Sequence, residues 1–597
     1  MPASVTARTI SLLLTIAVAW TAAPRDASAQ ASATALSQRS DPAYLVLAPD
    51  RGFLGNEEVR DVLAAVRQQI PNTTLAFATA EKTSENLAGP LGALRAGDKS
   101  REIVVLPLFM STHEALYRKA ADALAEEPAV TIAEPFGASY LAEEMLFDRI
   151  RSLTSGGRLD AGGHGGVVVE HGHAQHGTPV ASGGGGAPHL ILLADGAESA
   201  ASADGIRADL EPLVRRAVHR FGLHGGEVAV LHDRLGDGGE QAFTSTIDGI
   251  REAADRNERV LLVPMNFGRR LTTMMSQWSW TTMALRGQSN IVEGDPDLTS
   301  HPNLERWLLR TAHAHGPLTR DEIGVIFVPH GSEYNWNETL REGLAPLRDD
   351  YVTEDAFSMV DPYVVERAVR KLEDRGMKAA MLVRIFSLES SFRDQAEYVL
   401  GLRREPPAGG HMGMPLERIE SHLLFHTLGG VEAHPRFARA LMERAREIST
   451  DPANETVLLL AHGTGADEDN ERWMDNLRSI ADYIREHTPT PYRDVRVHTW
   501  REDWPEKRAA TIPEIRSMIE EANEDGGTAL VVPVRTNDQG PARSLIPDLA
   551  FRYGYGFSPH PEFTAWVRDQ IEEGIRVLTD TPKRGDPQAE QALPNQM

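Results

Sequence analysis

Cysteine is absent from the 597-residue chain. Disulfide bonds, thiolate metal sites and cysteine nucleophiles are therefore excluded, so any metal ion must be bound by His, Asp, Glu or Met side chains. Long apolar runs are missing too, since no segment after the N-terminal one approaches the roughly twenty residues of a membrane span. The chain also lacks a cluster of Lys and Arg, and its formal net charge is −25. This balance argues against nucleic acid or anionic lipid as a partner.

The N-terminus has the pattern of a secretory signal peptide. Arg8 precedes an apolar run at 10–20, and the small residues Ala-Ser-Ala at 27–29 suit a cleavage site. The apolar run is too short to span a membrane. We therefore predict a signal peptide at 1–29 and a mature protein that is periplasmic or secreted.

A fourfold internal repeat organises most of the remaining chain. Each unit begins with an apolar strand pattern and a turn, namely "AYLVLAPDRG" from 43, "HLILLADGAE" from 189, "GVIFVPHGSE" from 324 and "TVLLLAHGTG" from 456. Helical patterns alternate with continuously apolar strands, which is typical of parallel sheets covered by helices on both faces. We predict an α/β fold with parallel sheets flanked by helices, in four units at 41–155, 188–316, 320–448 and 453–580.

The segments between and after these units differ from them in composition. The linker at 156–187 is rich in glycine, and the tail at 581–597 is rich in proline, glutamine and charge and is predicted to be disordered. Closely spaced histidines in the linker are typical of an exchangeable metal-binding tract, and they also fit a hydrophilic linker without such a role. These histidines are His164, His171, His173 and His176.

Two histidines occupy matched places in the repeat. His330 and His462 each follow the first apolar strand and precede glycine and a small hydroxyl residue. Ligands of open α/β sheets bind beyond the carboxyl ends of the strands, and glycine permits the sharp turn needed there. Imidazole can accept a proton or bind a metal ion near neutral pH. We predict such a role for both. A turn cap is the alternative, because two acidic residues, Asp50 and Asp195, replace the histidine in the first two units.

The phrases "LLLAHGTGADEDNERWMDNL", "VVLPLFMSTHEAL" and "HPRF" resemble the sirohydrochlorin chelatases of the CbiX/SirB type, the class II chelatases. The resemblance covers most of the mature chain, with one half-domain per unit. It implies a chelatase-like fold in which the four units form two bilobal modules. It further implies a tetrapyrrole as the small-molecule partner, and a divalent cobalt, iron or nickel ion that histidines insert into it.

The family pattern has one histidine after the first strand and a second a few residues after the third strand. The resemblance places His330 and His462 at the first position and His113 at the second, as catalytic and metal-binding residues. No single unit contains both histidines. The residues at the second position of the other units are Arg270, Ser390 and Gln539. Two hypotheses follow, an exported chelatase and a non-catalytic periplasmic protein that binds metal or tetrapyrrole on the same fold.

Two further patterns have structural interpretations. A His-Pro pair opens the closing helix of three units, where the imidazole fits a cap-like turn. These histidines are His301, His434 and His560. The Met- and Trp-rich stretch at 274–283 is assigned to the core, with stacking on a flat ligand as the alternative.

Overall fold

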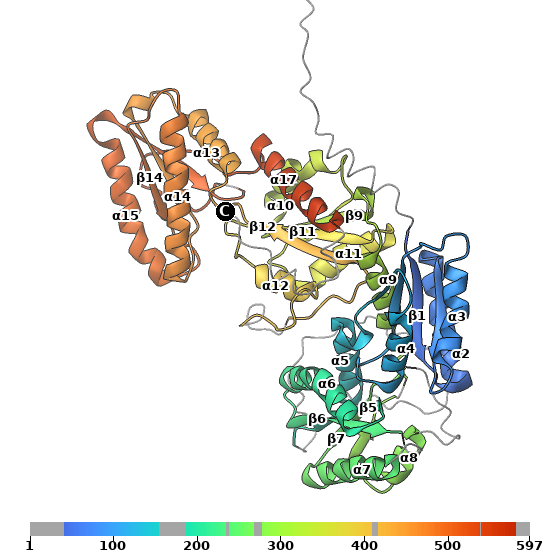
Figure 1. Cartoon of the computed structure of the whole chain (residues 1–597). Helices are drawn as coiled ribbons and strands as arrows, with labels where there is room; N and C mark the ends of the chain where they lie inside the picture. The colour runs from blue at the N-terminus through green and yellow to red at the C-terminus, as the bar shows by residue number, and fades with distance from the viewer. Residues whose placement is uncertain are drawn as a thin grey trace, which may run out of the picture. The chain divides into compact units, whose positions relative to one another are not determined.

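The computed structural model describes residues 41–154, 186–233, 238–267, 277–295, 297–408, 416–537 and 539–580 (Figure 1). The predicted signal peptide, the linker histidines and the predicted tail lie outside the described residues. Within the described ranges, no helix has the length and apolar character needed to cross a membrane.

Four parallel sheets of four strands each form the framework. The strand that begins a unit lies inside its sheet, in the order second, first, third, fourth. The first two sheets contain β1 (Ala43–Pro49), β2 (Thr73–Ala78), β3 (Ile103–Pro107), β4 (Val130–Ile132), β5 (His189–Ala197), β6 (Gly225–His232), β7 (Val260–Pro264) and β8 (Ile291–Glu293). The last two contain β9 (Ile323–Pro329), β10 (Thr353–Asp355), β11 (Ala379–Ile385), β12 (Leu424–Gly429), β13 (Glu455–Ala461), β14 (Asp494–Thr499), β15 (Thr528–Val534) and β16 (Arg552–Tyr553). The predicted α/β fold class is confirmed.

Helices connect the strands and cover the sheets (Figure 1). Those of the first two units are α2 (Gly52–Gln69), α3 (Thr83–Leu94), α4 (Ala115–Ala125), α5 (Tyr140–Thr154), α6 (Ala200–Phe221), α7 (Gly239–Arg256), α8 (Gln277–Ala284) and α9 (Pro302–His315). Those of the last two are α10 (Tyr334–Leu344), α11 (Pro362–Asp374), α12 (Arg393–Val399), α13 (Pro435–Ile448), α14 (Asp467–His487), α15 (Pro505–Asn523), α16 (Ala542–Leu545) and α17 (Pro561–Thr579). Short 3-10 turns occur at Phe136–Ala138, Arg320–Glu322, Ala345–Leu347, Pro452–Asn454 and Glu524–Gly526.

The apolar strands are continuous because both faces of each sheet are covered. Every residue of β1 is buried. Its side chains alternate, so that Val46 joins one apolar cluster and Leu45 joins another on the opposite face. The same burial of all strand residues occurs in β9 and β13. A half-exposed sheet would show alternating polar residues instead.

The closing helix of each unit packs on the neighbouring unit's sheet. Helix α5 contacts β7, and α9 contacts β3 and α2. Likewise α13 contacts β15 and α14, whereas α17 contacts β11 and β12. The first unit is thereby joined to the second, and the third to the fourth, through exchanged helices. This exchange completes the cores that the two units of each pair share.

The histidines of the His-Pro pairs cap their helices as predicted. In α9, α13 and α17 the Nδ1 atom of the N-cap histidine accepts a hydrogen bond from the backbone N–H two residues later, at 3.2 Å in each case. The proline in the first turn needs no such bond because it lacks an N–H group. In the Met- and Trp-rich stretch, Trp278 and Trp280 of α8 pack against the core of the second unit.

Candidate functional site

Strand register defines which residues are equivalent in the four units. The first and third strands pair in every sheet. After each third strand, one backbone carbonyl accepts a hydrogen bond from the segment that leads to the closing helix. The third-strand residue two positions before this carbonyl is taken as the common reference in all four units. The reference pairs are Leu47 with Pro107, Leu193 with Pro264, Val328 with Arg384 and Leu460 with Pro533.

The perch position is defined as the residue two positions after the first-strand member of each reference pair. It is occupied by Pro49, Asp195, His330 and His462 in the four units. His330 and His462 are therefore equivalent, and Asp195 is their counterpart in the second unit. Asp50 comes one residue later and corresponds to the glycine that follows each histidine. The first unit thus has no ligand side chain at the perch position.

His330 is exposed, and its backbone hydrogen bond defines its tautomer. Nδ1 lies 2.7 Å from the carbonyl oxygen of Gly331. A carbonyl oxygen only accepts, so Nδ1 carries the proton and the lone pair is on Nε2. Gly331 has φ +75°, and a Cβ there would lie 2.6 Å from the carbonyl oxygen of Phe357. Glycine is therefore required by both its conformation and the space available.

His462 repeats this geometry and adds two carboxylates. Its Nδ1 lies 2.8 Å from the carbonyl oxygen of Gly463. Its Nε2 lies 3.1 Å from Asp503 Oδ2 and 4.0 Å from Glu502 Oε2. Arg535 holds Glu502 at 3.0 Å, whereas the Asp503 side chain is 70% exposed. The two carboxylates attract a cation placed beside Nε2.

Tryptophan rings flank both histidines. The ring of Trp336 lies 6.3 Å from that of His330. Around His462, the Trp473 ring lies 6.3 Å away at an interplanar angle of 21°, and the Trp504 ring lies 6.1 Å away at 87°. Aromatic walls of this kind suit a flat apolar ligand placed next to an imidazole.

Asparagine residues fix the turn after the perch position in the first, third and fourth units. Asn337 Oδ1 accepts the backbone N–H of Ser332 at 2.9 Å, and Asn470 Oδ1 accepts that of Thr464 at 3.3 Å. The first unit has the same contact, from Asn56 to the N–H of Arg51 at 2.9 Å. These positioning residues were not predicted from the sequence. Their signal is an asparagine near the start of the helix that follows the turn in these three units.

The fourth unit contacts the helix next to His330. Asn537, after β15, donates from Nδ2 to the backbone carbonyl of Trp336 at 2.8 Å. On the other side, Arg472 of α14 donates to Glu432 of the third unit at 2.8 Å. The same Glu432 oxygen accepts the backbone N–H of Glu389 at 2.8 Å. The loop after β15 is thus hydrogen-bonded directly to the third unit. The loop after β11 is hydrogen-bonded to Glu432, which in turn contacts the fourth unit.

The corresponding place in the first two units is filled by an ion pair. Arg51 donates to both Asp195 carboxylate oxygens, at 2.7 and 2.8 Å. Glu114 is buried beside this pair, and its burial, with the charge of Asp195, raises the pKa of Glu114 to about 8. Asp195 is therefore neutralised by a cation of the chain itself. The two modules have diverged in chemistry.

The other predicted site residues are not brought together with the perch histidines. His113 is exposed, and a Cβ added to Gly205 of α6 would lie 2.4 Å from its ring. In the described residues, no hydrogen bond, ion pair or ring contact joins His113 to His330 or His462. Ser390 is exposed, and Arg270 lies outside the described residues. Across the parts of the chain that the structure describes, no three His, Asp or Glu side chains form a group that could hold a metal ion.

Neither a family model nor a curated protein matches the chain. Among solved structures, it is similar to DR2241 from Deinococcus radiodurans, a multi-domain protein with structural similarity to chelatases, with 21% identity and a TM-score of 0.30. That match covers 42% of this chain and 55% of DR2241. The chain is also similar to SirB from Bacillus subtilis with Fe3+, with 15% identity, a TM-score of 0.30 and coverage of 44% and 96%. The chelatase function therefore remains a proposal.

Proposed function

We propose that this is an exported protein of the chelatase type that inserts a divalent metal ion into a tetrapyrrole, using His330 and His462. The proposal rests on one observation above all. Both imidazoles donate from Nδ1 to the carbonyl of the next glycine, at 2.7 and 2.8 Å. This bond fixes the orientation of both rings. Its repetition in two units favours a functional role of the two histidines over an incidental turn.

Metal insertion needs a ligand that delivers the ion and a base that receives the pyrrole N–H protons. His462 has two carboxylates on the Nε2 side, which favours a cation there. His330 is exposed, and no hydrogen bond or ion pair occupies its Nε2 atom among the described residues, so this nitrogen is available as a base. We assign metal delivery to His462 and proton acceptance to His330. Cobalt, iron or nickel is the substrate ion, and the linker histidines are an auxiliary metal-binding tract.

A second candidate is a periplasmic protein that binds metal or tetrapyrrole without catalysis. Two observations favour it. No unit contains both family histidines, and no three-ligand group is preformed within the described ranges. A carrier needs only one binding event, so it does not require a base next to the bound ion.

The deciding experiment is metallation of sirohydrochlorin by the chain that lacks residues 1–29. Cobalt(II) or nickel(II) is added with and without protein, and the visible spectrum of the macrocycle is followed. A chelatase accelerates metallation, and His330→Ala and His462→Ala both abolish that acceleration. His487→Ala, an exposed histidine stacked on Tyr483 at 4.0 Å, is the matched control and leaves it intact. Binding without acceleration establishes the carrier, and no binding of metal or pigment refutes both functions.

A further inference from the structure

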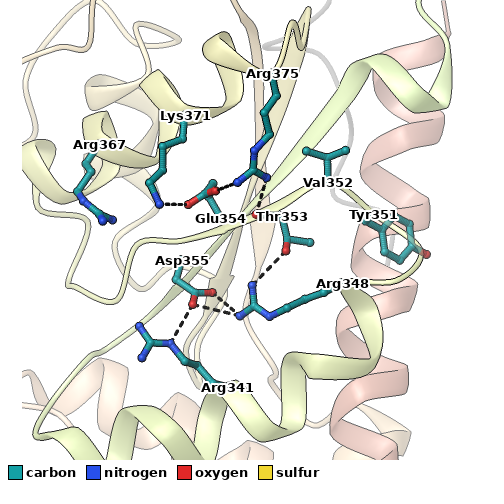
Figure 2. A pocket seen from close by; sticks show the side chains of 10 residues that line it. All are labelled: Arg341, Arg348, Tyr351, Val352, Thr353, Glu354, Asp355, Arg367, Lys371 and Arg375. Carbon is teal, nitrogen blue, oxygen red and sulfur yellow. Dashed lines mark hydrogen bonds and ion pairs between the residues drawn. The ribbon is translucent and has the colours of Figure 1, made fainter.

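A polar pocket of about 590 Å³ lies beside the edge strand of the third sheet. Helix α10, strand β10 and helix α11 contribute its walls (Figure 2). It is lined by Arg341, Arg348, Tyr351, Val352, Thr353, Glu354, Asp355, Arg367, Lys371 and Arg375. Neither perch histidine is among these residues. The pocket is therefore separate from the residues that carry the proposed chelatase function.

Positive charge dominates this pocket in an otherwise acidic protein. Five of its ten lining side chains are cationic and two are carboxylates, which leaves an excess of three positive charges. The whole chain has a formal net charge of −25. A local excess of the opposite sign concentrates anions, because field lines are focused within a concave site.

Each carboxylate in the pocket is shared by two cations. Glu354 accepts from Lys371 at 2.9 Å and also from Arg375. Asp355 accepts from Arg341 at 3.0 Å and from Arg348 at 2.8 and 3.1 Å. Glu354 does not neutralise both of its partners, whereas in the Asp355 group Arg341 is also paired with Glu338, which is not among the lining residues. Figure 2 shows these two groups side by side in the pocket.

Arg367 supplies the remaining positive charge. It lies on α11, four residues before Lys371, and is exposed. No hydrogen bond or ion pair joins it to another residue in the described part of the chain, and it carries no dashed line in Figure 2. Its guanidinium donors are therefore available to a ligand without first breaking a bond inside the protein.

The first unit has the same pocket without the same charge. A cavity of about 570 Å³ lies between α2, β2 and α3, and its lining includes Arg60 and Arg67. Their spacing matches that of Arg341 and Arg348. Helix α3 contains no Lys or Arg, and its C-cap Arg95 does not line the cavity. Helix α11 and its C-cap carry cations at every fourth residue from Arg367, and all three line the pocket. The first and third units thus share the pocket, and of these two only the third has the cationic wall.

We propose that the pocket of the third unit binds a small oxyanion with at least two negative charges, of phosphate or carboxylate chemistry. Guanidinium groups bind such oxyanions through pairs of parallel hydrogen bonds. The volume falls within the range of about 300–1,000 Å³ that holds small molecules. Arg367 and Lys371 form one face of the site, and Arg341 and Arg348 form the other.

Isothermal titration calorimetry of the chain that lacks residues 1–29 tests the proposal, with pyrophosphate and citrate as probes. We expect saturable binding of at least one probe, weaker at high salt. Arg367→Gln should weaken it about tenfold, because it removes one charge-assisted hydrogen-bond donor. Lys371→Gln should weaken it as well, while Arg375 keeps its bond to Glu354. The stronger probe identifies the phosphate or the carboxylate class.

Arg60→Gln, in the matching pocket of the first unit, is the control variant and should leave binding unchanged. Thermal melting of each variant establishes that it is folded before titration. Absence of saturable binding by both probes overturns the proposal. Equal affinity of the unsubstituted chain, Arg367→Gln and Lys371→Gln for a probe also overturns it. A loss of affinity in Arg60→Gln as large as that in Arg367→Gln has the same meaning.

Discussion

Replacing Asp503 by asparagine tests the proposed role of His462 as a metal ligand. The carboxylate lies 3.1 Å from Nε2, on the side where an ion would be bound. Glu502, the other carboxylate, is engaged by Arg535 and lies farther away, at 4.0 Å. Asp503 is therefore the group with the larger influence on a cation at His462. Its amide replacement keeps the size of the side chain and removes the negative charge.

The expected magnitude follows from distance and exposure. Two unit charges separated by about 3 Å attract by roughly 5 kcal/mol at an effective dielectric constant of about 20. The Asp503 side chain is 70% exposed, so solvent screening leaves only a fraction of that attraction. Loss of a group that supports a metal ligand costs about ten- to a hundredfold in metal affinity. We expect Asp503→Asn to raise the cobalt(II) dissociation constant about tenfold, or about 1.4 kcal/mol.

Equilibrium dialysis with cobalt(II) measures this change in a chain whose four linker histidines are alanine. Glu506→Gln is the matched control, since Glu506 is an exposed carboxylate three residues away, in the first turn of α15. It should alter the dissociation constant less than twofold. An unchanged constant in Asp503→Asn, or an equal loss in the control, refutes a direct role of Asp503 at the ion.

Three further predictions concern the stability of the fold. Asp195→Asn should lower the free energy of unfolding by about 3 kcal/mol in urea titration, because Arg51 is left buried without its partner, and the metallation rate of folded protein should stay unchanged. Burial raises the pKa of Glu114 from 4.5 to about 8, so the folded chain retains a proton that the unfolded chain releases within this window. Stability should therefore fall as pH rises between these values, by up to about 1.4 kcal/mol per unit, and Glu114→Gln should remove that slope. Gly574→Ala should cost about 1–3 kcal/mol, since its Cβ would lie 2.8 Å from side chains of β11 and β12, whereas Gly249→Ala, with open space around it, should stabilise slightly in thermal melting.

The fold class could be predicted because a strand that is buried on both faces of its sheet is apolar at consecutive positions. The continuous apolar runs of β1, β9 and β13 are buried throughout, as parallel strands between helical layers require. The helix caps at His301, His434 and His560 were also predictable, because a cap depends only on residues within one turn.

The exchange of closing helices was not predictable from the repeat. Phe437 of α13 and Phe563 of α17 lie at the same place in their helices and are both buried. Either residue would be apolar whichever sheet covered it. Sequence periodicity therefore shows that a helix has a buried face, and does not show which unit supplies the contacts.

The perch position of the first unit was misjudged for a related reason. The phrases that end in Pro49-Asp50 and Pro329-His330 align by their prolines, which suggests that Asp50 replaces the histidine. The backbone hydrogen bond beyond the third strand, taken with the strand pairing, shifts this alignment by one residue, so that Pro49 is the counterpart of His330. The carboxylates near His462 were missed because Glu502 and Asp503 follow the second strand, about forty residues farther along the chain.

The most direct test of the central claim compares the metallation activity after substitution of either perch histidine with that after substitution of His113, which the resemblance places at the second histidine position. The measurement is the rate of cobalt(II) insertion into sirohydrochlorin by His330→Ala, His462→Ala and His113→Ala, each verified as folded. We predict that the first two substitutions reduce the rate to that of the protein-free control, while His113→Ala retains most of the acceleration. Unchanged rates in His330→Ala and His462→Ala would contradict the account.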